Sequence, residues 1–274
     1  MSKKGTIGFF DSGYGGLTVL NEVRKVLPEY DYIYLGDNAR APYGTRSFDM
    51  VYEYTWQCVK YLFDKGCELV ILACNTASAK ALRSIQQKEL LDYPGKRVLG
   101  VIRPSAENIS RFSKNNEIAV LATEGTVQSN SYILEFNKFS PETLVNQYAC
   151  PMWVPLVESG EYKTSEGQSL IKRDLEQIKC SYPNADVYLL GCTHYPILLQ
   201  YILSCVSKNI KVISQGSIVA KSLKKYLSRH SWLVRRLSTT GSIHYLTTEN
   251  SIKFNERVKE IFDITLTSEH IKIK

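Results

Sequence analysis

The feature that most constrains the fold is a regular alternation between short apolar runs and longer amphipathic segments. Apolar runs indicate β-strands, whereas apolar residues at every third or fourth position indicate α-helices. The clearest expected helices cover residues 17–27 and 50–66, the second ending at Gly66. The expected strands, with the polar residues that end several of them, are TIGFFDSG, DYIYLGD, ELVILACN, RVLGVI, EIAVLAT, ADVYLLGC and KVIS. This alternation predicts an α/β fold in which helices cover both faces of mainly parallel sheets.

The chain makes one particular turn twice. In VILACNTASAKAL and in LLGCTHYPILL, an apolar strand runs into a cysteine, two polar residues and a helical pattern. Ligands of parallel sheets bind beyond the carboxyl ends of the strands, where DSG, GDNA, ACNT, ATEG and GCTH all fall. At such a position, backbone N–H groups and the helix dipole can favour the thiolates of Cys74 and Cys192 and also bind a carboxylate.

Two such cysteines, one from each repeated half, could face each other across a single carbon atom. One thiolate would then remove a proton from one face while the other thiol returns a proton to the opposite face. A free thiol has a pKa of about 8.5, so this chemistry requires local activation. Cysteines at strand ends can also be simple packing residues, and the periodicity alone does not decide between the two interpretations.

Composition restricts the class of protein. At 274 residues the chain is long enough for two domains of ordinary size, and 44% hydrophobic with 22% charged residues is typical of a globular protein. Asp11 interrupts the first apolar run too early for a signal peptide, and no apolar segment reaches membrane-helix length, so we expect a cytoplasmic protein. The seven cysteines form no CxxC pair, which argues against a disulfide framework and a zinc site.

The net charge of +7 raises the question of nucleic-acid binding. Its densest contribution is KSLKKYLSRHSWLVRRL, residues 221–237, where basic residues alternate with apolar ones at helical spacing. An amphipathic surface helix with a solvated basic face is the simpler interpretation, and a nucleic-acid or partner site is the alternative. Charge alone predicts nonspecific attraction rather than function.

Longer motifs give a more specific answer. The chain resembles the cofactor-independent glutamate racemases of the aspartate/glutamate racemase family in IGFFDSGYGGLTVL, YLGDNARAPYGTRS, LVILACNTASAKAL, CPMWVPLVESGE and LLGCTHYPILL. The resemblance implies that Cys74 and Cys192 are the two catalytic acid/bases. It implies that Asp11 assists on the Cys74 side, and that His194, with Glu158 as its carboxylate partner, assists on the Cys192 side.

The same resemblance implies which residues hold the substrate. Those that would cradle the two carboxylates and the ammonium group of glutamate are Asp11, Ser12, Tyr43, Gly44, Asn75, Thr76, Thr193 and His194. The glycines of DSGYGG allow close approach of the backbone but form no GxGxxG or P-loop signature. No pyridoxal-phosphate lysine or metal-ligand spacing stands out, so no cofactor and no metal are expected.

The implied architecture has two α/β domains related by pseudo-twofold symmetry, with the active site in the cleft between them. We expect residues 1–99 and 205–274 to form the first domain and residues 100–204 the second, in a protein that forms homodimers. The implied function is interconversion of L- and D-glutamate, which supplies D-glutamate for peptidoglycan synthesis.

Two other functions stay open. A racemase of aspartate or another acidic amino acid would differ in pocket size, which the sequence does not give. A racemase-fold protein could instead bind nucleic acid or a topoisomerase through the basic segment, although the intact catalytic set argues against this reading.

The chain departs from the family pattern at two places. After strand KVI it has Ser214 and Gln215, where Asp-Ser or Asp-Pro is usual, and Asn38 stands in GDNA where Thr is more usual. We expect the first departure to reduce local rigidity or alter regulation rather than remove the chemistry.

Overall fold

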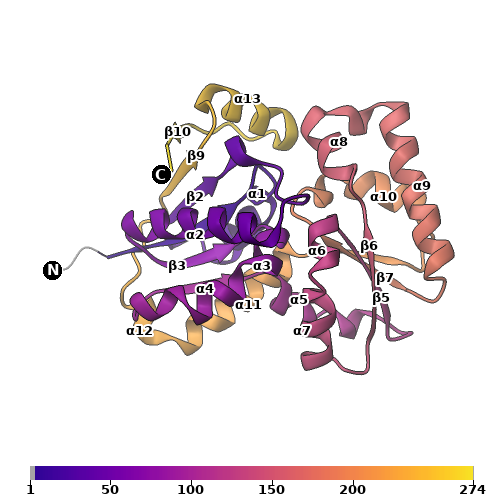
Figure 1. Ribbon diagram of the computed structural model, residues 1–274, viewed down its shortest axis with the longest axis horizontal. Coiled ribbons are helices and arrows are strands. Elements are labelled where there is room, and N and C mark those ends of the chain that lie inside the picture. The colour runs from indigo at the N-terminus through magenta and orange to yellow at the C-terminus, as the bar shows by residue number, and fades with distance from the viewer. Residues whose placement is uncertain (1–3, 274) are drawn as a thin grey trace.

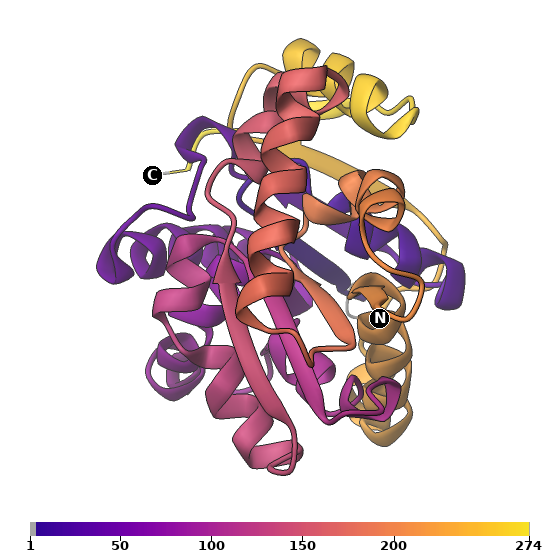
Figure 2. The same ribbon diagram turned by 90° about the vertical axis from the view of Figure 1, so that its right-hand side faces the viewer.

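Two parallel β-sheets lie side by side in the computed structural model, which describes residues 4–273 (Figures 1 and 2). The first sheet has the order β10-β9-β2-β1-β3-β4 and the second β6-β5-β7-β8. The strands of the first sheet are β1 (Thr6–Asp11), β2 (Tyr32–Gly36), β3 (Cys67–Leu72), β4 (Arg97–Gly100), β9 (Ile243–Thr247) and β10 (Ser268–His270). Those of the second are β5 (Glu117–Ala122), β6 (Leu144–Ala149), β7 (Val187–Gly191) and β8 (Lys211–Ser214).

The two sheets repeat one topology. The order β2-β1-β3-β4 in the first sheet recurs as β6-β5-β7-β8 in the second, and every neighbouring pair of these strands is parallel. The third strand of each unit, β3 or β7, leads into the turn that carries Cys74 or Cys192. The predicted α/β fold with mainly parallel sheets is confirmed, and the two cysteines hold equivalent places in it.

Helices cover both faces of each sheet. Alternate residues of β1 point to opposite faces, so Ile7 and Phe9 pack with α1 and α11 while Phe10 packs with α2. The helices of the first half are α1 (Leu17–Val26), α2 (Phe48–Asp64), α3 (Asn75–Lys80), α4 (Leu82–Gln87), α11 (Gly216–Arg229), α12 (Ser231–Val234) and α13 (Ser251–Phe262). Those of the second half are α5 (Ile102–Ala106), α6 (Glu124–Gln128), α7 (Ser131–Phe139), α8 (Trp153–Ser159), α9 (Ser165–Ser181) and α10 (Leu199–Cys205).

One predicted domain boundary is wrong. The chain was expected to return to the first domain after about residue 204, but residues 211–214 form β8, which pairs with β7 at the edge of the second sheet. The return therefore comes after Ser214, where α11 begins and packs along α1. A short apolar run indicates a strand, but it does not indicate which sheet accepts its hydrogen bonds.

The basic segment also differs from its prediction as one helix. The helix stops at His230, whose backbone is not helical (φ −123°, ψ 59°), and a short second helix, α12, follows. α11 buries Val219, Leu223 and Leu227 against the first half and leaves Lys224 exposed, as expected of an amphipathic surface helix. Between residues 4 and 273, no helix has the length and apolar character needed to cross a bilayer.

Candidate active site

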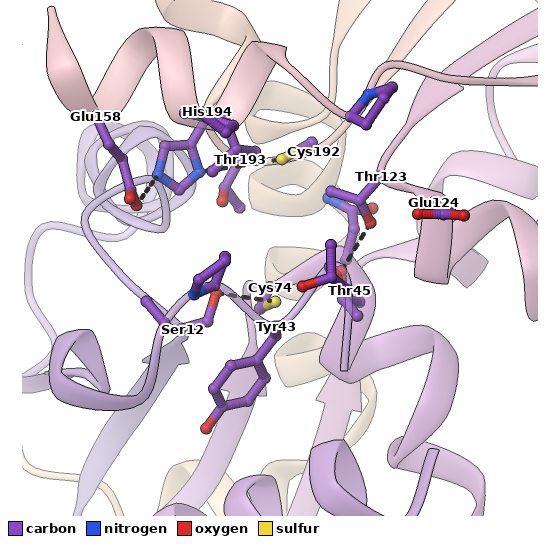
Figure 3. Close-up of a pocket in the computed structure, with 18 residues that line it drawn as sticks. Ser12, Tyr43, Thr45, Cys74, Thr123, Glu124, Glu158, Cys192, Thr193 and His194 are labelled. Carbon is purple, nitrogen blue, oxygen red and sulfur yellow. Dashed lines mark hydrogen bonds and ion pairs between the residues drawn. The ribbon is translucent and has the colours of Figure 1, made fainter. Parts of the chain in front are cut away.

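A cavity lies between the two halves at the carboxyl ends of their strands (Figure 3). The loops after β1, β2 and β3 supply one wall, and those after β5, β6 and β7 supply the other. Its lining includes all the predicted site residues except Asp11: Ser12, Tyr43, Gly44, Cys74, Asn75, Thr76, Glu158, Cys192, Thr193 and His194. The structure thus brings together residues that are up to 182 positions apart in the chain, from Ser12 to His194.

Cys74 caps the helix that follows it. Its Sγ accepts a hydrogen bond from the backbone N–H of Ala77 at 3.4 Å and lies 3.4 Å from Oγ of Ser12. These contacts favour the thiolate, as expected, but burial outweighs them and the nearby charge of Asp11 adds to it, which raises the pKa of Cys74 to about 12. Cys74 therefore keeps its proton at neutral pH in this state, because burial outweighs the hydrogen bonds that favour its thiolate.

Cys192 faces Cys74 from the other wall and has different neighbours (Figure 3). Nδ1 of His194 lies 4.0 Å from its Sγ, and Nε2 of His194 lies 3.1 Å from Oε1 of Glu158 on α8. Burial alone would lower the pKa of His194, but its hydrogen bonds and charge interactions with Cys192 and Glu158 raise it well above its ordinary value. A positive charge on His194 can therefore stabilise negative charge on Cys192.

Asp11 lies beside the cavity rather than in its lining. It is fully buried, and its carboxylate accepts hydrogen bonds from the backbone N–H of Gly13 at 3.1 Å and from Oγ1 of Thr193 at 3.3 Å. Burial raises the pKa of Asp11, although the charge of His194 opposes this shift. The expected direct contact between Asp11 and a substrate ammonium group would require the groups around it to move.

The walls also meet through a cluster of hydroxyl groups. Thr76 Oγ1 lies 2.9 Å from Thr123 Oγ1 and 3.3 Å from Thr126 Oγ1, so the start of α3 is bonded to the turn after β5. Beside it, Nδ2 of Asn75 is buried and has no hydrogen-bond partner among residues 4–273. Because Asn75, Thr76 and Thr123 all line the cavity, its wall contains an unpartnered amide donor next to two threonine hydroxyls.

Hydrogen bonds to Asp37, on the side away from the cavity, hold the loop after β2 in place. The hydroxyl of Tyr43 donates to Asp37, and Nε of Arg40 donates to the same carboxylate at 2.7 Å. Figure 3 shows the Tyr43 hydroxyl pointing away from the cavity. Tyr43 and Gly44 can therefore offer a substrate their backbone N–H groups rather than the phenol, while the carbonyl of Gly44 accepts from Gly125 N–H at 2.8 Å.

Glycine is needed where the DSGYGG turn meets the opposite wall. A Cβ atom on Gly15 would lie 2.4 Å from Oγ1 of Thr193 and 2.7 Å from Nδ1 of His194, closer than real Cβ contacts come. Only a residue without a side chain lets the β1 turn pack directly on the GCTH turn. The close approach that Gly15 allows is to the protein's other half.

Known proteins resemble this chain along nearly its whole length. A family model described as Asp/Glu/Hydantoin racemase matches residues 18–223. A glutamate racemase from Listeria monocytogenes serotype 4a (strain HCC23) is 38% identical over 273 residues, which cover 98% of this chain and 99% of that protein. The chain belongs to the Asp/Glu/Hydantoin racemase family.

Solved structures agree with this family assignment. The glutamate racemase isoform RacE1 from Bacillus anthracis superposes with a TM-score of 0.89 at 29% identity, covering 99% of this chain and 98% of that chain. A glutamate racemase from Francisella tularensis, solved in complex with D-glutamate, superposes with a TM-score of 0.85 at 29% identity over 98% of both chains. This chain therefore has the two-domain racemase fold.

Sequence reasoning missed several residues of the racemase cavity. Thr45, Thr123 and Glu124 line it together with Pro151 and Pro155. The sequence does carry a signal for Thr123, because ATEG ends a strand at the same edge of a sheet as ACNT and GCTH. Within the described residues, no three or more His, Cys, Asp or Glu side chains gather as a metal-binding group.

Proposed function

We propose that this protein interconverts L- and D-glutamate by moving the Cα proton between Cys74 and Cys192. The observation that carries the proposal is the pair of cysteines on opposite walls of one cavity, each at the end of the third strand of a repeated unit. A thiolate on one side takes the Cα proton, and the electron pair of the broken C–H bond stays on the substrate. The thiol on the other side then delivers a proton to the opposite face, which inverts the configuration.

The surroundings of the two cysteines suggest the starting protonation state. Burial raises the pKa of Cys74 to about 12, so Cys74 can act as the proton donor. A charged His194, held by Glu158, stabilises a thiolate on Cys192, which can act as the base. In the reverse direction the roles exchange, and the substrate's ammonium group helps to offset the cost of a thiolate at Cys74.

Substrate binding in this proposal uses the donors of the cavity wall. The free Nδ2 of Asn75, with the hydroxyls of Ser12 and Thr76 and the backbone at Tyr43 and Gly44, would hold the carboxylates. On the other wall, Thr193 would add its backbone N–H group. Because carboxylate binding spreads the negative charge that develops during proton removal, these donors would also lower the barrier to the reaction.

Glutamate is proposed in preference to aspartate because the similar proteins named above are glutamate racemases, and one of them was solved with D-glutamate. In this role the protein would supply D-glutamate for peptidoglycan. The cytoplasmic location and the homodimer stay predictions from the sequence.

Exchange of the Cα proton tests the proposal directly. The reduced protein is incubated in heavy water with L-glutamate, D-glutamate or L-aspartate, and loss of the Cα proton is followed by NMR together with optical rotation. We expect exchange and approach to a racemic mixture for both glutamate enantiomers but not for L-aspartate. A Cys180→Ala variant, which removes an exposed thiol away from the cavity, controls for nonspecific thiol chemistry. If glutamate does not exchange while the protein is folded, the proposal is wrong.

A further inference from the structure

A chain of buried hydrogen bonds leads from the start of α11 to the cavity. Nε2 of Gln215 lies 2.7 Å from Oγ of Ser105, 2.8 Å from the hydroxyl of Tyr132 and 3.2 Å from the carbonyl oxygen of Val101. The Tyr132 hydroxyl in turn donates to Oδ1 of Asn75 at 2.7 Å. Gln215, Tyr132 and Asn75 are all buried, so water does not compete for these bonds.

The carbonyl group of Val101 fixes the direction of every hydrogen bond in this series. The carbonyl oxygen of Val101 can only accept, and the Ser105 hydroxyl donates to it at 3.0 Å. The two protons of the Gln215 NH₂ group face three oxygens, so the short contacts to Ser105 and Tyr132 take one proton each and Val101, at 3.2 Å, shares one of them. The Gln215 amide must therefore present its NH₂ end to Ser105 and Tyr132. A Tyr132 oxygen that accepts from Gln215 directs its own proton to Asn75.

The hydrogen bond from Tyr132 to Asn75 determines which end of the Asn75 amide is left without a partner. Because Tyr132 donates to Oδ1 of Asn75, Nδ2 is the end of that amide left free, and it has no partner among residues 4–273. A buried donor without a partner costs about 1–3 kcal/mol, so it is a strong site for an acceptor on a ligand. A carboxylate oxygen supplies such an acceptor with a negative charge.

We propose that Gln215 is a positioning residue, which fixes the Asn75 amide through Tyr132 so that its NH₂ group meets a substrate carboxylate. The inference rests on the proposed role of Asn75 in substrate binding. Gln215 stands where the family pattern has Ser or Pro, and neither of those side chains carries an NH₂ group. At this departure, where reduced local rigidity or altered regulation is expected, the side chain forms a bonded bridge from the residue before α11 to α7 and α3.

Gln215→Glu is the sharpest test because it keeps the shape of the side chain and reverses its hydrogen-bonding polarity. An ionised carboxylate accepts from Tyr132, which draws the tyrosine proton away from Asn75 and frees the amide to rotate. We expect KM for glutamate to rise about tenfold, equivalent to about 1.4 kcal/mol, with kcat within about threefold of the parent protein. Gln200→Glu, on the exposed side of α10, adds the same charge and is expected to leave both constants unchanged.

A double-mutant cycle distinguishes an effect transmitted through Tyr132 from a nonspecific structural effect of the substitution. Tyr132→Phe removes the link to Asn75, so in that background Gln215→Glu should no longer raise KM. Urea unfolding of each variant checks that the fold is retained. An unchanged KM in folded Gln215→Glu, or an equal KM effect with and without Tyr132, would overturn the inference. Asn75→Ala distinguishes a failure of the Gln215 inference from a failure of the proposed function. An unchanged KM in Asn75→Ala would reject the proposed contact between Asn75 and the substrate itself.

Discussion

Cys74 and Cys192 occupy the same place in a repeated strand order but have different surroundings. Cys74 caps α3, contacts Ser12 and lies near the buried Asp11, whereas Cys192 lies beside a histidine that is bonded to Glu158. Burial dominates at the first site and raises the pKa of its thiol to about 12, while a nearby positive charge is available at the second. The repeated backbone thus sets where the two sulfur atoms lie, and the residues around them give the two sulfur atoms different electrostatic surroundings.

Removing either sulfur should have the largest effect. Because each direction of racemisation needs one base and one acid, Cys74→Ala and Cys192→Ala should each lower racemisation by at least about 1,000-fold. Circular dichroism of glutamate solutions measures the loss, and Cys205→Ala serves as a control outside the cavity. Substantial racemisation by either cavity variant would contradict the assignment of one acid/base role to each cysteine, because one cysteine would then suffice.

Changing the neighbours should have a smaller effect that differs between the two sides. His194→Gln and Asp11→Asn should each lower kcat/KM by about 100-fold. Since L- and D-glutamate have equal free energies in water and share one transition state, kcat/KM must fall equally in both directions. The difference between directions should appear in kcat, with a matching change in KM, and the two variants should favour opposite enantiomers. A shift toward the same enantiomer in both variants would contradict the assignment of one neighbour to each cysteine.

The contact between the halves gives a matched pair of glycine substitutions. Gly15→Ala places a Cβ 2.4 Å from Thr193 Oγ1, so we expect a loss of about 1–3 kcal/mol in unfolding free energy together with reduced activity. Gly13→Ala brings its Cβ only to 3.3 Å from Glu158 Oε1, so the unfolding free energy should fall by less than about 1 kcal/mol. Urea unfolding measures both, and equal losses would show that the Gly15 contact is not special.

The smallest expected effect is a pH dependence of stability that comes from the Glu158–His194 pair on the Cys192 side. The pKa of Glu158 is lowered, so its contribution to stability is present above 4.5 and lost as the pH falls through the folded value. The pKa of His194 is raised, so its contribution is present below 6.5 and lost as the pH rises through the folded value.

Glu158→Gln should therefore destabilise the protein most between pH 4.5 and 6.5, the ordinary pKa values of the two groups. The difference in urea midpoint from the parent protein should shrink as the pH rises through the raised pKa of His194. Glu161→Gln, at an exposed position nearby, should show no such dependence. A difference that does not vary with pH would mean that the pair is not charged in the folded protein.

Much of the fold was predictable because most strands are continuous apolar runs. β6 was missed because its sequence, LVNQYA, lies at a sheet edge, is only partly buried and lacks such a run. The break at His230 was missed because basic and apolar residues keep helical spacing across it. Sheet membership of β8 depends on pairing with a distant strand, which local sequence does not encode.

The site was predictable to the extent that its residues follow strands. Motifs at strand ends located Cys74 and Cys192, whereas the other predicted residues of the lining were implied by the resemblance to the racemase family. The shift in the pKa of Cys74 was not predictable, because it depends on burial by the other half of the chain. The bonds of Gln215 could not be inferred either, since they join residues 83 and 110 positions apart.

The hydrogen bond from Thr193 to Asp11 crosses between the two halves of the molecule. Any motion that parts the halves enough to admit or release a ligand through this seam must break that bond and draw the β1 turn away from His194. The open form would then lack the assembled acid/base groups. Ligand exchange and proton transfer would thus belong to different conformations, and a reactive thiolate would form only after the entrance has shut.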